Sequence, residues 1–307
     1  MCPVSIGRCF RAASSVALGA PPWSWVAREA FRNPEQQDAV FSQRVRVTPM
    51  DEPRRTSAAE ALSTAERTRQ AIAPLSAVGG GLTVDDAYEI QMVNVRRRLG
   101  DGRQIYGHKV GLTSKAMQDA LGISEPDYGY LLDDMLVIES VAADRYLQPR
   151  VEIEIAFILG EDLGGSNITA ERVLEATSFV TPAIEIIDSR IMDWKITLED
   201  TIADNASSAG IVLGRERTSP DGVNLAGELG ELRVNGQLMD QGTGEAVLGH
   251  PANAVAWLAN KLGEFGTVLQ AGQVILPGSV TRAVDVASGD HVLGTFSTLG
   301  EVSLQLT

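Results

Sequence analysis

Acidic residues interrupt a run of the chain that otherwise has the composition of a buried β-strand. In residues 151–158, Glu152 and Glu154 are two positions apart, and the period of two in a strand places both side chains on one face, about 7 Å apart. The same face continues through Ala156 and Ile158, which are apolar. Two carboxylates beside a buried surface are costly to desolvate and repel each other unless a cation neutralises them. A fold for this chain must therefore either neutralise the pair or leave it in solvent.

A second strand-like run, residues 182–187, has the same feature, because Glu185 is its single charge. Three carboxylates without histidine or thiolate ligands suit a hard divalent ion, Mg²⁺ or Mn²⁺, better than zinc. The alternative interpretation is a solvated strand face with outward acids. Sequence spacing does not show that Glu152, Glu154 and Glu185 converge, so both interpretations stay open at this stage.

The overall composition predicts a globular protein that binds neither nucleic acid nor membranes. The 307 residues are 44% apolar and 21% charged, which allows one large domain or two ordinary ones. Apolar runs such as residues 155–159 are far shorter than the roughly 20 residues of a membrane span. The formal net charge of −14 disfavours nucleic acids and anionic membranes as partners. An anionic substrate would therefore need a local positive feature.

The residue types available for catalysis are few. The two cysteines, Cys2 and Cys9, cannot form a disulfide framework or a zinc site that organises the fold, and they favour a reducing, cytoplasmic setting. The three histidines are His108, His250 and His291, so a Cys–His nucleophilic pair is disfavoured. Phosphate-binding loops, dinucleotide fingerprints, zincin motifs and nucleophile elbows do not occur. Catalysis should depend on carboxylates, lysine or a metal.

The N-terminal region differs in charge from the rest of the chain. Residues 1–49 have six arginines and three acids, a net charge of +3 against −14 for the whole. We expect residues 1–57 to be an extension that is disordered or absent from the native chain, with Met50 as an alternative start. A targeting signal is a further alternative, although Pro21 and Pro22 would break its helix. Residues 58–106 should form an N-terminal helical part, and 107–307 a catalytic domain.

Two helices are predicted from capping and periodicity. Thr83 can cap a helix with Asp86 three residues later, and Gly100 ends it. Its apolar residues recur at spacings of three and four, namely Val84, Tyr88, Met92, Val95 and Leu99. Pro251 begins the second helix and Gly263 ends it. Its apolar stripe consists of Val255, Leu258 and Leu262.

The remainder of the chain has the texture of short strands. Strands are predicted at residues 151–158, 183–187, 232–234 and 274–276. Asn235-Gly236, between two strand-like runs, is a type I′ hairpin signal. Because the strands do not alternate regularly with helices, the pattern favours an α+β fold with a mixed or antiparallel sheet.

Several segments, in order from about residue 58 to the C-terminus, resemble the 2-keto-4-pentenoate hydratase family. They are Gly107–Met117 (GHKVGLTSKAM), Glu125–Gly129 (EPDYG), Pro149–Glu154 (PRVEIE), Pro182–Trp194 (PAIEIIDSRIMDW), Asp204–Gly210 (DNASSAG), Val247–Trp257 (VLGHPANAVAW) and Leu276–Arg282 (LPGSVTR). An ordered series of this kind is far more specific than any one motif. 4-Oxalocrotonate decarboxylases and fumarylacetoacetate hydrolase-like enzymes are more distant relatives in the same superfamily.

The resemblance implies a fold and a ligand set. The expected fold is α+β, a mixed β-roll core of the fumarylacetoacetate hydrolase C-terminal type with a smaller N-terminal helical part, in a ring-like homo-oligomer. Glu152, Glu154 and Glu185 match the family's metal ligands, for Mg²⁺ or Mn²⁺. A bound cation would accept the carboxylate and C2 oxygens of a 2-hydroxydienoate substrate.

The resemblance also assigns the polar residues near the substrate. Lys109 and Asp127 match active-site residues, and we expect Lys109 to anchor substrate and move protons, with a pKa lowered by the nearby metal. Ser207 and Ser279 fall in substrate-binding segments. Arg190 is expected to pair with Asp188 or Asp193. Trp194 and Trp257 are expected in the core, and His108 is expected to be a structural residue with satisfied hydrogen bonds.

The implied activity is hydration of 2-hydroxypenta-2,4-dienoate, or a 5-alkyl homologue, in the meta-cleavage catabolism of aromatic or steroid rings. A proton added at C5 and water added at C4, with a proton at C3, would yield a 4-hydroxy-2-oxo acid. Two alternatives stay open: decarboxylation of 4-oxalocrotonate at the same metal site, and a non-catalytic subunit. A downstream aldolase or decarboxylase is a possible protein partner.

Overall fold

The protein was analysed as a computed structural model that describes Met1 and residues 49–77, 81–114, 118, 123 and 125–307. The chain divides into two units, Met1–Arg46 and Val47–Thr307, and the fold described here is that of the second. Most of the expected extension therefore lies outside the described residues.

Five α-helices and several 3-10 turns are described in this unit. The helices are α2 (Glu52–Thr68), α3 (Val84–Gly100), α5 (Ala170–Ala176), α6 (Leu198–Ala203) and α7 (Pro251–Gly263). The 3-10 turns are η1 (Leu75–Ala77), η2 (Asp133–Met135), η3 (Ala143–Arg145), η4 (Met192–Trp194), η5 (Asn205–Ser207), η6 (Leu225–Gly227) and η7 (Gly244–Ala246).

Twelve strands form two sheets. They are β1 (Ile105–Gly111), β2 (Asp127–Leu132), β3 (Ser140–Val141), β4 (Arg150–Leu159), β5 (Thr177–Ile187), β6 (Ser208–Leu213), β7 (Leu229–Val234), β8 (Gln237–Thr243), β9 (Val274–Leu276), β10 (Val284–Asp285), β11 (His291–Phe296) and β12 (Gly300–Leu306). The first sheet has the order β2-β1-β9-β4-β5-β6, with β10 also paired to β4, and the second has the order β3-β12-β11-β7-β8.

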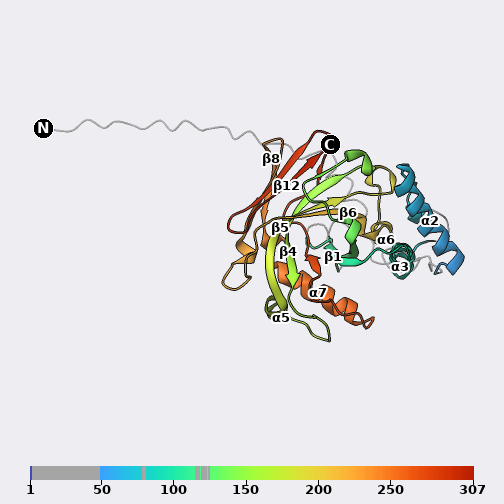
Figure 1. The fold of residues 1–307 in the computed structure, drawn as a ribbon, viewed down its shortest axis with the longest axis horizontal. Coiled ribbons are helices and arrows are strands. Elements are labelled where there is room, and N and C mark those ends of the chain that lie inside the picture. Colours follow the sequence, from blue (N-terminus) through green and yellow to red (C-terminus); the bar gives the residue numbers. More distant parts are fainter. Residues whose placement is uncertain (2–48, 78–80, 115–117, 119–122, 124) are drawn as a thin grey trace. The chain divides into compact units, whose positions relative to one another are not determined.

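The two sheets pack against each other. Strands β11 and β12 contact β5, and β7 contacts β4. The pairs β1–β9 and β3–β12 are parallel and the other pairs within the sheets are antiparallel, which confirms the predicted α+β class with mixed sheets. Figure 1 shows α2 and α3 together at one end of this unit, away from β8.

The long central strand β4 has two different faces. Ile153, Ile155 and Phe157 are fully buried in the core between the sheets. Gly230 and Gly294, on β7 and β11, have no side chain where a Cβ would lie against Ile153, so the second sheet can approach closely. Because side chains alternate along a strand, the glutamates of β4 lie on the opposite face from this core.

The helices pack over a separate apolar cluster. It includes Ala59 and Leu62 of α2, Ile90 of α3 and Ile202 of α6. Helix α6 belongs to residues 107–307, which we expected to form the catalytic domain, so the helical part also includes a distant stretch of the sequence.

Helix α2 begins earlier than the predicted start of the helical part. Asp51 accepts a hydrogen bond from the backbone N–H of Arg54 at 3.0 Å and caps the helix, and Pro53 lies in its first turn. The first six residues of α2, Glu52–Ser57, therefore belong to the stretch assigned to the extension. An acid followed by proline was the sequence signal for this boundary.

Several local predictions are confirmed. Thr83 and Asp86 form the expected capping box of α3, and α7 runs from Pro251 to Gly263. Asn235 and Gly236 both have positive φ, as a type I′ turn between β7 and β8 requires. At these positions the capping and turn residues alone predict the structure that is observed.

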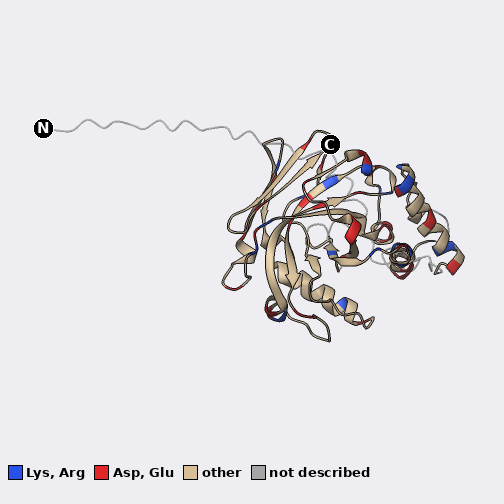
Figure 2. Ribbon diagram, viewed as in Figure 1, with Lys and Arg blue, Asp and Glu red and all other residues tan. Residues whose placement is uncertain are grey.

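Charged residues lie mainly on helices and loops. Figure 2 shows blue and red residues along α2 and α3, while the strands of both sheets are mainly tan. Among the described helices, none has the length and apolar character needed to cross a bilayer.

His108 on β1 is an unusual core residue. It is 2% exposed, its ring centroid lies 5.0 Å from that of Tyr130, and neither ring nitrogen has a hydrogen-bond partner among the described residues. The expectation of satisfied hydrogen bonds at His108 is thus not met. Burial lowers its pKa to about 4.

We expect His108→Phe to flatten the acid dependence of stability. The ordinary histidine pKa of about 6.5 applies to the unfolded chain, so the unfolded state binds an extra proton between pH 6.5 and 4. The parent should therefore lose up to about 3 kcal/mol as the pH falls through this window, and the variant should lack this component. Urea unfolding at closely spaced pH values measures the difference, with exposed His291→Gln as the control. Parallel curves for parent and His108→Phe would contradict the assignment.

Candidate metal centre and active site

The three predicted glutamates converge on one point of the first sheet. Glu152 of β4 and Glu185 of β5 are direct partners across the antiparallel pair, and Glu154 follows two residues along β4. One carboxylate oxygen from each residue can be chosen so that all three lie within 4.8 Å of one another. Strand pairing therefore settles the question that the sequence spacing left open: the acids form one cluster.

This cluster lacks the hydrogen bonds that buried carboxylates need. Glu154 and Glu185 are 1% and 0% exposed. One oxygen of Glu154 accepts from the Gly278 N–H at 2.7 Å, but its other oxygen and both oxygens of Glu185 accept no hydrogen bond from a described residue. Buried carboxylates with so few hydrogen bonds are expensive, so the cluster calls for positive charge nearby.

The pKa values of the three glutamates also show that the cluster has too much negative charge. Burial raises the pKa of Glu152 to about 7, and repulsion from Glu185 adds to the effect. Burial together with repulsion from Glu185 also raises the pKa of Glu154 well above its ordinary value, and burial raises that of Glu185. A divalent cation would stabilise all three in the charged form. Because every donor is a carboxylate oxygen, the residues fit a hard dication.

Lys109 of β1 provides one positive charge beside the cluster. Its Nζ lies 3.5 Å from Glu185 Oε2 and donates to the Ala206 carbonyl at 3.1 Å, and the residue is 5% exposed. Burial alone would lower its pKa, but Glu185 and the other nearby carboxylates outweigh burial and raise it. Without a bound metal, the neighbouring carboxylates thus raise the pKa of Lys109, and the lowering that we expected depends on the metal.

Asp127 can lie beside Lys109 because its register partner on β1, Gly111, has no side chain. Asp127 of β2 is the register partner of Gly111 on β1, and a Cβ at Gly111 would overlap the Asp127 carboxylate and lie 3.3 Å from Lys109 Nζ. Burial raises the pKa of Asp127, although Lys109 opposes the rise. A buried carboxyl beside an ammonium is a candidate for proton transfer.

A cavity of about 590 Å³ opens onto these groups. Its lining includes Lys109, Asp127, Glu152, Ser207 and Ser279. The Ser279 hydroxyl donates to the Thr281 carbonyl at 2.7 Å, which ties this hydroxyl to the backbone, whereas Ser207 Oγ lies 3.3 Å from the Thr201 hydroxyl. Both serines therefore line the space that substrate would enter.

Comparison with known proteins identifies the family of this chain. The sequence profile of the fumarylacetoacetate hydrolase C-terminal family matches residues 117–307. The chain is 45% identical to 2-hydroxyhexa-2,4-dienoate hydratase of Comamonas testosteroni, over 78% of this chain and 93% of that protein. It is 42% identical to 2-oxo-hept-4-ene-1,7-dioate hydratase of Escherichia coli, over 81% and 96%. The chain belongs to the 2-keto-4-pentenoate hydratase family.

A solved structure confirms the fold of this hydratase-family chain. The 4-oxalocrotonate decarboxylase of Pseudomonas putida G7, complexed with magnesium and adipate, superposes with a TM-score of 0.80 at 34% identity, covering 84% of this chain and 99% of that one. The predicted core of the fumarylacetoacetate hydrolase type is thus confirmed.

A strained loop in the hydratase-family chain positions the partner of Lys109. Asn205, Ala206 and Ser207 all have positive φ, at 56°, 50° and 56°. Non-glycine residues adopt this left-handed region at a cost of about 1–3 kcal/mol each, and they do so mainly at functional sites. The loop turns the Ala206 carbonyl toward Lys109.

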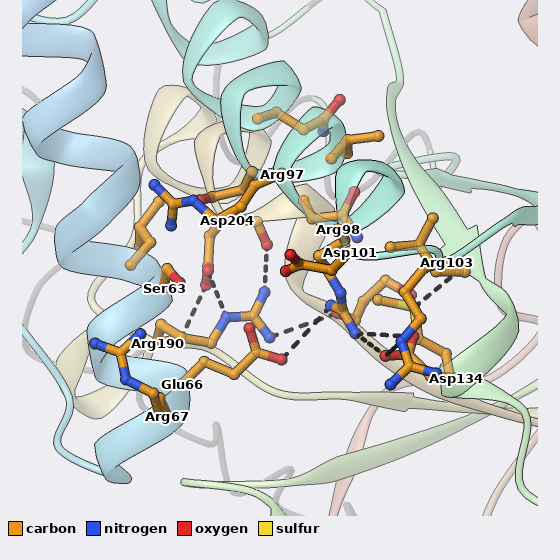
Figure 3. Close-up of a pocket in the computed structure, with 18 of the residues that line it drawn as sticks. Ser63, Glu66, Arg67, Arg97, Arg98, Asp101, Arg103, Asp134, Arg190 and Asp204 are labelled. Atoms are coloured by element: carbon orange, nitrogen blue, oxygen red, sulfur yellow. Dashed lines mark hydrogen bonds and ion pairs between the residues drawn. The ribbon is translucent and has the colours of Figure 1, made fainter.

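A buried ion pair of Arg190 fixes the start of this loop, and the predicted partner of Arg190 was wrong. Arg190 pairs with Asp204, not with Asp188 or Asp193, and it also donates to the Asp204 carbonyl (Figure 3). Asp188 instead accepts from the backbone N–H groups of residues 147 and 148, and Asp193 pairs with Lys195. The buried Arg190–Asp204 pair fixes the start of the loop.

Sequence reasoning also misplaced Trp194. It is partly exposed and lines the cavity, instead of lying in the core. Its indole N–H donates to the Gln148 carbonyl at 3.1 Å. Ile196 and Leu198, which follow it, line the cavity as well. Residues 188–194 (DSRIMDW) have no apolar periodicity, so the sequence did not indicate that Trp194 faces the cavity.

We expect Asp204→Asn to be strongly destabilising, because it leaves the buried Arg190 guanidinium without its counter-charge. Breaking such a pair costs about 3–5 kcal/mol. Urea unfolding measures the change. Glu139→Gln is the matched control, because Glu139 pairs with Arg215 at the surface, where the side chains are 71% and 87% exposed, and its effect should stay below about 1 kcal/mol. Equal effects of the two variants would show that the Arg190–Asp204 pair does not support the loop.

Proposed function

We propose that this protein is a metal-dependent hydratase. It adds water to 2-hydroxypenta-2,4-dienoate, or to a 5-alkyl homologue, and forms a 4-hydroxy-2-oxo acid in the meta-cleavage catabolism of aromatic or steroid rings. The central observation is a cluster of three glutamates, two of them buried, with Lys109 beside it, at a cavity of about 590 Å³. The names of the relatives, which are hydratases of such dienoates, support this reaction.

Glu152, Glu154 and Glu185 are the proposed ligands of Mg²⁺, with Mn²⁺ as a substitute. When bound, the ion would act as a Lewis acid at the C2 oxygen and would bind the substrate carboxylate. The magnesium complex of the decarboxylase at 34% identity supports a divalent ion in this fold. The three carboxylates repel an anionic substrate. The metal ion and Lys109 must therefore supply the positive charge that attracts it.

Lys109 is the proposed anchor of the substrate. Its ammonium lies beside the glutamate cluster, where a positive charge favours the developing negative charge on the C2 oxygen. The Ala206 carbonyl and Glu185 hold its Nζ in place. Preorganised charge of this kind needs no rearrangement during the reaction.

Asp127 is the proposed proton carrier. The reaction moves the enol proton of the substrate to C5, adds the oxygen of water to C4 and places a proton from water on C3, so the net change is one water. Each transfer needs an acid or base at hydrogen-bond distance, typically with an effect of about 10²–10⁴ on rate. Asp127 lines the cavity and lies beside Lys109, where it can reach a bound substrate.

Decarboxylation of 4-oxalocrotonate is the second candidate, and the structural similarity to a decarboxylase favours it. The sequence identity to hydratases is higher, at 45% and 42% against 34%. A non-catalytic role is disfavoured because the complete acid cluster and Lys109 are costly to keep without a function. The ring-like homo-oligomer and the aldolase or decarboxylase partner remain predictions.

We expect Glu154→Gln to abolish stabilisation by Mg²⁺ and to leave the metal-free fold intact. The amide oxygen can still accept from the Gly278 N–H, and removal of one charge relieves repulsion in the cluster. The parent should gain about 2.7 kcal/mol at a Mg²⁺ concentration of 100 Kd, seen as a rise in Tm. Glu301→Gln, an exposed acid on β12, is the control. An unchanged Mg²⁺ response in Glu154→Gln would remove Glu154 from the ligand set.

We expect the purified protein to consume 2-hydroxypenta-2,4-dienoate in a reaction that EDTA stops and Mg²⁺ restores. Loss of the ultraviolet absorbance of the diene follows the rate, and the product is identified as 4-hydroxy-2-oxopentanoate by mass spectrometry. Lys109→Met should reduce kcat/KM by at least about 10²-fold. Release of carbon dioxide from 4-oxalocrotonate without hydration of the dienoate would instead establish the decarboxylase.

A further inference from the structure

The loop of residues 205–207 lies directly on strand β2, at the point where β2 pairs with Lys109. Gly129 of β2 is the register partner of Lys109 on β1. A Cβ at Gly129 would lie 2.5 Å from the Asn205 carbonyl oxygen and 3.2 Å from the Ala206 Cβ. Because Gly129 has no side chain, the loop backbone can approach the strand, and the Ala206 carbonyl reaches Lys109 Nζ at 3.1 Å.

The Asn205 side chain fastens this loop to β2. Its Oδ1 accepts from the Tyr130 N–H at 2.8 Å, and its Nδ2 donates to the Tyr130 carbonyl at 2.9 Å. Among the described strands, β2 is the last one in the first sheet, so these two groups meet no further strand. One side-chain amide thus supplies the hydrogen bonds that a neighbouring strand would make. Because both ends of the amide are used, the loop is fixed in position and in orientation relative to β2.

The other contacts of the loop do not fix it to β2. Arg190 pairs with Asp204 just before the loop, and the Ser207 carbonyl accepts from the Asp188 N–H at 2.8 Å. Ser207 Oγ lies next to the Thr201 hydroxyl of α6. Of the three described loop residues, Asn205 supplies the side-chain hydrogen bonds to β2.

Asn205 does not contact the space that substrate would enter. Ala206 and Ser207 line the cavity of about 590 Å³. Asn205 instead lines a second cavity, of about 570 Å³, with residues of α2 and α3 (Figure 3). Its φ of 56° is tolerated better by asparagine than by most residues. Asparagine therefore meets both requirements of this position, a left-handed backbone and an amide that donates and accepts.

We propose that Asn205 is a positioning residue for the hydration reaction. Its amide fixes the loop to β2, so that the Ala206 carbonyl holds Lys109 Nζ at the cavity. This inference rests on the proposed function and adds a residue to it. A displacement of about 1 Å at Lys109 can lower the rate by about 10²-fold. Because Lys109 is proposed to stabilise charge that develops during the reaction, loss of the amide should lower kcat more than it changes KM.

Asn205→Gly tests this role, because glycine adopts the left-handed backbone and lacks the amide. With Mg²⁺ and 2-hydroxypenta-2,4-dienoate, kcat should fall by about 10²-fold while KM changes by less than about threefold. Asn235→Gly is the matched control. Asn235 also has positive φ, at 52°, and its side chain bonds Asp290 and the His291 N–H away from the cavity, so kcat should equal that of the parent. Equal kcat in the two variants would overturn the proposal.

A second variant and a second measurement make the test independent of one substitution. Asn205→Asp keeps the acceptor for the Tyr130 N–H but places a carboxylate oxygen against the Tyr130 carbonyl, so its kcat should fall as well. Parental kcat in Asn205→Asp would overturn the proposal. Hydrogen exchange at the Tyr130 amide should be faster in Asn205→Gly than in the parent, because this N–H loses its acceptor.

The exchange measurement separates this inference from the proposed function. Unchanged exchange at Tyr130 in Asn205→Gly would overturn the role of the amide, whichever reaction the protein catalyses. A parent that hydrates no dienoate would overturn the proposed function and the catalytic role of Asn205 together. In that case faster exchange would still establish that the amide holds the loop on β2.

A double-mutant cycle tests whether Asn205 acts through Lys109. In a Lys109→Met background, Asn205→Gly should lower kcat/KM by less than about threefold, because the ammonium that the loop positions is already absent. A merely structural role would lower kcat/KM by the same factor in both backgrounds, and that result would overturn the proposal. The rise in Tm with Mg²⁺ should be the same in Asn205→Gly and the parent, since the amide bonds Tyr130. Loss of this rise would place the effect at the glutamates and contradict the proposed role.

Discussion

Mutual repulsion among buried carboxylates is the constraint on which the rest of this structure depends. Glu152, Glu154 and Glu185 are brought together by the pairing of β4 with β5, and Lys109 supplies one positive charge against three negative ones. The excess negative charge is neutralised by a divalent ion or by protonation, which is why the pKa values of Glu152 and Glu154 are raised. The cavity is lined by Asp127 as well as by Lys109 and Glu152, so a bound molecule would lie next to these charged groups.

Local signals in the sequence were sufficient for much of the fold. The capping box at Thr83, the Asn235-Gly236 turn and the helix from Pro251 each depend on neighbouring residues, and all are confirmed. The acids of β4 could be assigned to one face by alternation. Their convergence with Glu185 could not be predicted from spacing, because strand register is a long-range property. The family resemblance supplied that step.

The features that the sequence did not predict depend on contacts between residues that are far apart in the chain. The loop at residues 205–207 adopts left-handed backbone without glycine, so no turn signal marks it, and its support comes from Arg190 on a different segment. Trp194 looked like a core residue because tryptophan is usually buried, yet its polar N–H and a stacked arginine keep it at the cavity. Strained, functional segments are where local rules are expected to fail.

The packing of Ile196 and Leu198 against the helical cluster has an evolutionary consequence. The charged residues of the site lie on strands β1, β2, β4 and β5, while Ile196 and Leu198 pack against helices from other parts of the chain. Mutations beneath α2 and α3 can therefore reshape the room for a side group without disturbing the reacting centre. The shape of the cavity can therefore change while the charged groups on the strands keep their positions.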